Sequence, residues 1–249
     1  MNAVVSLVGL FEGTFVVFLR IGATLMLLPG FGSMRVPVRA RLALALVLAY
    51  AIAPLVPAAS LPVSTPAMLR LIGSELLVGA ALGLLVRAHF EALRTLASTG
   101  AAAIGFNALG GIITEANEPD GPLTALVALC ALATLFAFDF HHVALRALVM
   151  SFESVGFADD TRSLLVMVTD ALLAAFALAL ALFAPVIVYA ILAQLALGLV
   201  NKLAPAVPLY FIAMPAIIFG GLVLLARLIP AILAHHAGGL EAVIEGPGG

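Results

Sequence analysis

The chain has 249 residues, of which 64% are hydrophobic and only 10% are charged. Ordinary soluble domains carry roughly 25% charged residues, so this composition excludes a water-soluble globule. The formal net charge of −2 leaves no broad cationic surface, which argues against nucleic acid as a partner. The single cysteine, Cys130, excludes an intrachain disulfide and a cysteine-rich metal site.

The apolar runs are long enough to be membrane helices. A helix needs about 20 apolar residues to cross the hydrocarbon core of a bilayer, and strands or loops would leave backbone groups unpaired there. Proline, glycine and charged residues separate the runs. In order, the first part of the chain is predicted to contain apolar helices at 4–28, 42–56 and 69–86, a charged stretch at 87–94, small residues at 97–111, an acidic turn at 114–121 and an apolar helix at 122–138. In the charged stretch, Glu91 can pair with Arg87 and with Arg94 on one helix face.

The charged segment 151–162 divides the chain into two parts. Beyond it, residues 164–200 form an apolar run that is longer than one span requires. A proline in a helix interior removes a hydrogen bond and clashes with the preceding turn, so Pro185 should kink or split this run. A further apolar run covers residues 206–234. We therefore predict an all-α, multi-helix membrane protein with long kinked helices, in two parts: 1–160, and a helical hairpin with a frayed end at 161–249.

Glu12, Arg20 and Glu75 are charged side chains that fall inside the apolar runs. Charges in a membrane are costly and point to pairing or function. Glu12 and Arg20 are about 12 Å apart along a helix axis, too far for a direct bond, so each is expected to meet water or a partner subunit. Glu75 lies near the predicted start of its helix, where a carboxylate also suits the helix dipole, so a structural role is about as well supported as a functional one.

Glycine spacing marks two further features. Gly79 and Gly83 form a G-x-x-x-G step, which favours close packing of another backbone over simple tolerance of small residues. Gly105, Gly110 and Gly111 recur in a segment with Asn107 and few large side chains. From the residues alone, this segment fits either a packed helix end with a glycine cap or a flexible loop in a pore.

No residue pattern predicts catalysis. His141-His142 and His235-His236 invite a metal hypothesis, but adjacent side chains on a helix point about 100° apart and no further ligand motif completes a site. Asp139, three residues before His142, is expected to form a local pair with it. The usual motifs of serine hydrolases, P-loop ATPases and dinucleotide enzymes are absent from the sequence. We therefore expect no enzyme, no metal and no cofactor.

Several stretches resemble one family across nearly the whole chain. Leu19-Arg20-Ile21, Pro29, Val36-Pro37, Arg41 and Ala51-Ile52-Ala53-Pro54 resemble its first two helices, Glu75, Gly79 and Gly83 its glycine-spaced helix, and His141 its central histidine. Its G-x-x-N-[RK]-x-x-P signature is matched by Gly198, Asn201, Lys202 and Pro205, with Pro215 following. On these residues the chain resembles the flagellar biosynthesis protein FliR family, whose injectisome counterpart is SctT.

The resemblance implies a role. Such proteins are single-copy subunits of the type III export gate in the bacterial inner membrane, at the flagellar basal body, where they assemble with FliP, FliQ and FlhB. The gate conducts unfolded flagellar proteins and is needed for flagellum assembly. The resemblance also implies a FliP-like part over 1–160 and a FliQ-like hairpin over 161–249, packed against sister subunits.

The resemblance further implies a pore plug at about 105–122. A stopper for a pore that passes unfolded chains must be apolar and flexible, and the segment has that character. Ser98 and Ala103 stand where the family has Glu and Gln. The residues expected in the plug are Gly105, Phe106, Asn107, Leu109, Gly110, Gly111, Ile112 and Ile113.

Two alternatives remain open at this point. The first is an injectisome export gate in place of a flagellar one. The second, from a different class, is a secondary transporter of small solutes, which Pro-broken helices and charges in apolar runs would also fit. A transporter of that kind would require two inverted halves, and the sequence shows no inverted repeat.

Overall fold

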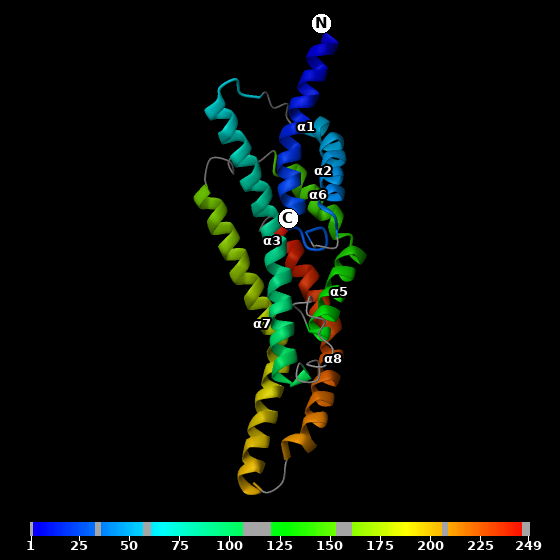
Figure 1. Ribbon diagram of the computed structural model, residues 1–249, viewed down its shortest axis with the longest axis vertical. Helices are drawn as coiled ribbons and strands as arrows, with labels where there is room; N and C mark the ends of the chain where they lie inside the picture. Colours follow the sequence, from blue (N-terminus) through cyan, green and yellow to red (C-terminus); the bar gives the residue numbers. More distant parts are fainter. Residues whose placement is uncertain are drawn as a thin grey trace. The chain divides into compact units, whose positions relative to one another are not determined.

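The computed structural model describes residues 2–32, 36–56, 61–106, 121–152, 161–205 and 209–245. Every regular element in these ranges is a helix, and none is a strand (Figure 1). The predicted all-α fold is thereby confirmed for the described part of the chain.

The first two helices end where proline and glycine predict. Helix α1 covers Asn2–Leu27, and Gly30 in the following turn has a φ of 86°, which favours glycine. Helix α2 covers Val38–Ile52 and begins directly after Pro37. A short 3-10 helix, η1 at Ala53–Leu55, follows with Pro54 inside it. The predicted ranges 4–28 and 42–56 differ from these elements by a few residues.

The third helix is longer than the predicted apolar run 69–86. Helix α3 runs without interruption over Thr65–Ala103. Charged residues do not break a helix when their side chains pair on one face, and Glu91 and Arg94 do so with 3.2 Å between the carboxylate and the guanidinium. The helix stops only at Gly105, whose φ of 79° ends it with a left-handed glycine.

Two shorter helices follow in the middle of the chain. Helix α5 covers Pro122–Ala137, with proline at its first position, where the missing N–H costs nothing. Helix α6 covers Phe140–Met150 and is not predicted by the sequence analysis. Between them Asp139 adopts a left-handed conformation with a φ of 57°.

The last two helices form an antiparallel hairpin (Figure 1). Helix α7 covers Thr161–Leu203 and continues through Pro185, so the expected split does not occur. Helix α8 covers Leu209–Glu245 and contains Pro215 and Pro230. The hydroxyl of Tyr189 on α7 donates a 2.9 Å hydrogen bond to the Ile217 carbonyl of α8.

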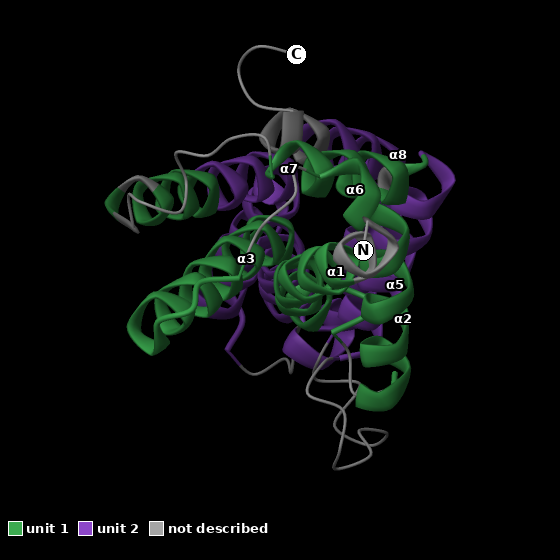
Figure 2. Cartoon of the chain, turned by 90° about the horizontal axis from the view of Figure 1, so that it is seen from above, with its two compact units in different colours: residues 1–88, 139–173, 240–249 green, residues 89–138, 174–239 purple. Residues whose placement is uncertain are grey.

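The chain folds into two compact units (Figure 2). Unit 1 consists of residues 1–88, 139–173 and 240–249, and unit 2 of residues 89–138 and 174–239. Helices α3, α7 and α8 each contribute residues to both units. Both units thus draw on both sides of residue 160, and the division into a 1–160 part and a 161–249 part stays a prediction.

Each unit has its own apolar core. In unit 1, one cluster joins α1, α2 and α6, and its buried members are Val17, Ile21, Leu25, Ala45, Ala49, Ile52 and Leu148. A second, smaller cluster of unit 1 joins Val78 and Ala81 of α3 to Leu164 of α7. In unit 2, the space over Gly100 of α3 is filled by Phe183 and Val186 of α7, both of which are fully buried.

Within the described residues, five helices are long and apolar enough to cross a membrane, and α5 with α6 would make a sixth if they count as one broken span. The apolar windows of the five are only 22–39% buried within the chain. Large side chains such as Phe11, Leu203 and Phe211 are more than three-quarters exposed. Such surfaces are not stable in water, so they must meet lipid or other polypeptides. The five spans are Val8–Leu27, Val38–Leu55, Thr65–Ala103, Leu164–Leu203 and Tyr210–Gly239.

Candidate functional site

The most highly organised polar group of unit 1 is an ion pair between α1 and α3. Arg20 Nε donates a 2.7 Å hydrogen bond to Glu75 Oε2, and Arg20 Nη2 donates a 3.0 Å bond to Glu75 Oε1. The two side chains are only 7% and 8% exposed. A fork of two parallel bonds is the strongest geometry available to a guanidinium and a carboxylate.

The remaining face of the Arg20 guanidinium is also occupied. Its Nη1 donates to the Ser151 carbonyl at 2.6 Å and to the Ser151 hydroxyl at 2.9 Å. The Phe152 ring lies under the guanidinium carbon, 3.9 Å from the ring centroid. Ser151 and Phe152 directly follow α6, so Arg20 ties the end of this helix to α1 and α3. We call Arg20, Glu75, Ser151 and Phe152 the ion-pair cluster.

The cluster corrects two expectations from the sequence. Arg20 finds its partner within the chain, so the expectation that it meets water or another subunit is wrong. Glu75 lies ten residues inside α3 and not in its first turn, so the helix dipole does not explain its position. Both errors have one cause: the bond joins residues 55 positions apart, and only the packing of α1 on α3 brings them together.

Two glycines of α3 allow this packing. A Cβ atom on Gly79 would collide with the Arg20 carbonyl oxygen, and one on Gly83 would lie 2.9 Å from the Thr24 carbonyl oxygen. Thr24 adds a polar contact between α1 and α3. Its hydroxyl can donate to the Arg20 carbonyl of α1 at 3.0 Å or to the Gly79 carbonyl of α3 at 2.9 Å. The structure therefore identifies α1 as the backbone that approaches the G-x-x-x-G step.

Glu12, another charge in an apolar run, lies outside the ion-pair cluster. It is half-buried on α1 and within the candidate span of that helix. Among the described residues no ion pair to Glu12 is found.

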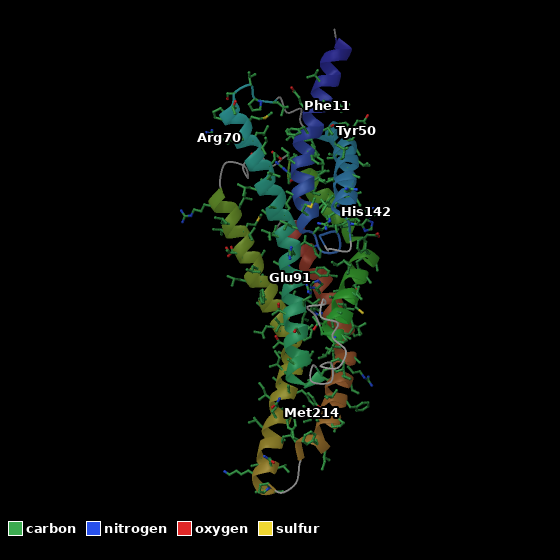
Figure 3. The ribbon with its side chains drawn as sticks, viewed as in Figure 1. Phe11, Tyr50, Arg70, Glu91, His142 and Met214 are labelled. Atoms are coloured by element: carbon green, nitrogen blue, oxygen red, sulfur yellow. The ribbon has the colours of Figure 1, made fainter. Side chains whose placement is uncertain are left out.

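Two of the predicted plug residues, Gly105 and Phe106, are described, and they lie in unit 2 where α3 ends. Two features favour glycine at position 105. Its φ is 79°, and a Cβ would lie 3.0 Å from Sδ and Cε of Met214 on α8 (Met214 is labelled in Figure 3). Asn107, Leu109, Gly110, Gly111, Ile112 and Ile113 lie outside the described residues.

The signature residues cluster at the end of the α7–α8 hairpin. Gly198, Asn201 and Lys202 are exposed on α7, and a Cβ on Gly198 would touch nothing within 4 Å. Pro205 in the connection and Pro215 on α8 are exposed as well. All five are thus on the surface of the described part of the chain. Exposed Leu195, Leu199, Leu203, Phe211 and Ile212 surround them.

Histidines of the described chain form two groups, one in each unit. In unit 2, His89 of α3 and His236 of α8 are both 3% exposed, with ring centroids 6.5 Å apart. Phe90 meets the His236 ring edge-on at 5.3 Å. In unit 1, Asp139, His141 and His142 gather at the start of α6 (His142 is labelled in Figure 3). The expected Asp139–His142 pair forms, with 3.6 Å between Oδ1 and Nδ1.

Other partners in these sites have no signal in the sequence. Ser151 and Phe152 hold Arg20 from a segment with no motif, and His89 is a single histidine within α3. Thr24 gives a weak indication, because it lies one helical turn after Arg20 on the same face of α1.

Taken together, these features define a multi-pass membrane protein that is helical in its described ranges. It has a buried ion pair in unit 1 and leaves most of the apolar surface of its spans for lipid or partner chains. The sequence model of the family described as "Bacterial export proteins, family 1" matches residues 11–243. The chain is 31% identical to the flagellar biosynthetic protein FliR of Caulobacter vibrioides over 216 residues, which cover 84% of this chain and 85% of that protein.

Further relatives agree with this result. The flagellar biosynthetic protein FliR of Escherichia coli K12 is 29% identical and covers 86% of this chain and 83% of its own length. That of Bacillus subtilis is 27% identical and covers 84% of this chain and 83% of its own length. The chain belongs to the FliR family of bacterial export proteins. It is therefore a component of the flagellar export apparatus, a membrane-associated export complex.

Proposed function

We propose that this chain is a non-catalytic subunit of the flagellar type III export gate in the inner membrane at the basal body, through which unfolded flagellar proteins pass. The observation that carries the proposal is the mismatch between the apolarity of its spans and their burial. Five candidate spans are at most 39% buried within the chain, although they contain long runs of large apolar side chains. FliP, FliQ and FlhB are the proposed neighbours that cover much of this surface.

The flagellar system is favoured over the injectisome because the relatives named above are flagellar proteins. No observation favours a solute transporter. In unit 1 the buried charges Arg20 and Glu75 satisfy each other, which removes one reason for placing a solute site there.

The two predicted parts of the sequence are assigned to two kinds of structure. Residues 1–160 are the FliP-like part, and residues 161–249 are the FliQ-like hairpin. The antiparallel arrangement of α7 and α8 supports the second assignment. The exposed signature residues at the end of this hairpin support a contact with a sister subunit, because their side chains are on the surface of the described chain and a Cβ on Gly198 would meet nothing within 4 Å.

The proposed plug covers about residues 105–122 and begins just after the end of α3. A plug that moves aside needs a fixed base and a pliable tip. Gly105 supplies a base, since its left-handed turn is held against Met214. The sequence from Phe106 to Ile113 supplies apolar groups and two adjacent glycines.

Co-purification tests the gate assignment. The tagged full-length chain is extracted from flagellated cells in mild detergent, and the subunits that accompany it are identified and counted by mass spectrometry. One copy with several FliP and FliQ chains is the expected result. A stable monomer that binds a solute would contradict the proposal and support a transporter.

Ion leakage tests the plug. Removing residues 107–113 should raise the conductance of the assembled gate, because the apolar stopper is lost. A matched variant replaces the same residues with a glycine and serine segment of equal length, which keeps the loop but not its apolar groups. Leakage should rise in both variants, and unchanged conductance in both would rule out the plug.

A further inference from the structure

We propose that Asp139, His141 and His142 form a binding site for a zinc-class transition-metal ion at the start of α6. Each residue offers one ligand atom, and these three atoms all lie within 4.8 Å of one another. The carboxylate Oδ1 of Asp139 lies 3.9 Å from His141 Nε2 and 3.6 Å from His142 Nδ1. This inference is independent of the export role.

The distances are close to those of a coordinated ion. Zinc binds histidine nitrogen and carboxylate oxygen at about 2.0–2.2 Å, which places two ligands of a tetrahedral ion about 3.3 Å apart. Asp139 and His142 are exposed and His141 is half-buried, so small side-chain rotations can close the remaining gap. Little packing opposes such rotations.

The local backbone explains why adjacent histidines converge here. Neighbouring side chains on a helix usually diverge, which argues against a metal site at two adjacent histidines. Here, however, the rings of His141 and His142 have centroids 4.1 Å apart and are inclined by 40°. Asp139 has a φ of 57°, so the chain turns sharply before α6. This turn brings the carboxylate to within 4 Å of both rings.

The ligand chemistry selects the class of ion. Two imidazoles suit zinc, copper or nickel, whereas calcium and magnesium prefer oxygen ligands. The positive end of the α6 dipole opposes a cation, and the Asp139 carboxylate offsets this effect. Three protein ligands leave at least one coordination position for water or for a ligand from another chain.

Zinc titration of the full-length chain, purified in mild detergent with a histidine-free tag and with any subunits that accompany it, tests the site. Zinc is supplied from a chromophoric chelator, and cobalt absorption reports the geometry. We expect one ion per chain, and binding at least about tenfold weaker in His142→Ala and in Asp139→Asn. His235→Ala is the matched control, since His235 is an exposed helical histidine of α8 and its loss should leave the affinity unchanged.

The outcomes separate this site from the export role. Equal zinc affinity in the original chain and in His142→Ala, or an affinity that His235→Ala lowers as much, overturns the proposal. Because His142 is exposed, the elution profile and helix content of His142→Ala should match those of the original chain, which makes loss of binding interpretable. Motility is measured in parallel: a motile His142→Ala strain whose protein no longer binds zinc supports the metal site and leaves the gate assignment untouched.

Discussion

Arg20 and Glu75 meet through two hydrogen bonds across 55 residues of sequence, and less than a tenth of either side chain is exposed. Breaking such a pair leaves one charge buried without its partner, which typically costs about 3–5 kcal/mol. We therefore expect Arg20→Ala and Glu75→Ala each to lower the unfolding temperature in detergent and the amount of protein in the membrane. Single variants as stable as the original chain would contradict this assignment.

Replacing both charged residues distinguishes the effect of losing the ion pair from the effect of leaving one charge buried without a partner. Apolar residues of similar size often substitute for a buried ion pair at little cost. Arg20→Met combined with Glu75→Leu should therefore recover much of the stability that either single alanine variant loses. Recovery should stay incomplete, because Arg20 also donates to the Ser151 carbonyl and hydroxyl. Thermal unfolding of these three variants and of the original chain in one detergent measures the difference.

A second prediction concerns the contact between α1 and α3. Alanine at position 79 places a methyl group against the Arg20 carbonyl, and a backbone atom cannot yield as a flexible side chain can. We expect Gly79→Ala to cost about 1–3 kcal/mol, as overpacking commonly does. Gly73→Ala, also on α3, is the matched control, since a Cβ there meets nothing within 4 Å. It should be neutral or stabilising by up to about 1 kcal/mol.

The sequence predicts most of the helices, but not the contacts between them. Pro29-Gly30 and Pro122 mark the ends of helices because proline and glycine act locally on the backbone. The full length of α3 is missed because the apolar run 69–86 covers only part of it, although the predicted pairing of Glu91 with Arg94 on one helix face is confirmed.

The ion-pair cluster shows the same limit at the level of the site. Gly79 indicates that some backbone comes close, and Arg20 that some anion is needed. Nothing in the local pattern links the two, because α1 and α3 are separated by α2 along the chain. Ser151 and Phe152 add to the cluster from the end of α6, a helix that the pattern of apolar residues does not predict.

A third prediction concerns Gly105. A non-glycine residue in the left-handed conformation costs roughly 1–2 kcal/mol, and its Cβ would also press on Met214. Gly105→Ala should therefore destabilise the chain, and adding Met214→Ala should remove the contact part of the loss but not the backbone part. Gly198→Ala, on an exposed face of α7, is the control. Thermal unfolding of the single and double variants measures the two parts of the loss. A double variant that recovers full stability would show that the left-handed backbone conformation at position 105 costs little.

A fourth prediction separates folding from assembly. Asn201 and Lys202 are exposed at the end of the hairpin, so alanine at either position should change stability by no more than about 0.5 kcal/mol. If they contact a sister subunit, the same variants should lower motility and the recovery of accompanying subunits. Swimming-zone diameter and co-purification measure the two effects. Normal motility of a strain that carries both Asn201→Ala and Lys202→Ala would show that these residues are needed neither for folding nor for assembly.

The last prediction concerns the imidazole of His236. Its Nε2 is buried with no hydrogen-bond partner among the described residues, and leaving such an atom unsatisfied costs about 1–3 kcal/mol. His236→Phe removes that atom and keeps an aromatic ring against the edge of Phe90, so stability should be equal or higher. His236→Ala leaves a cavity instead and should be clearly less stable, whereas alanine at the exposed neighbour His235 should have little effect. If phenylalanine at position 236 proves as damaging as alanine, the imidazole must bind a polar group, and a neighbouring subunit is then where that group should be sought.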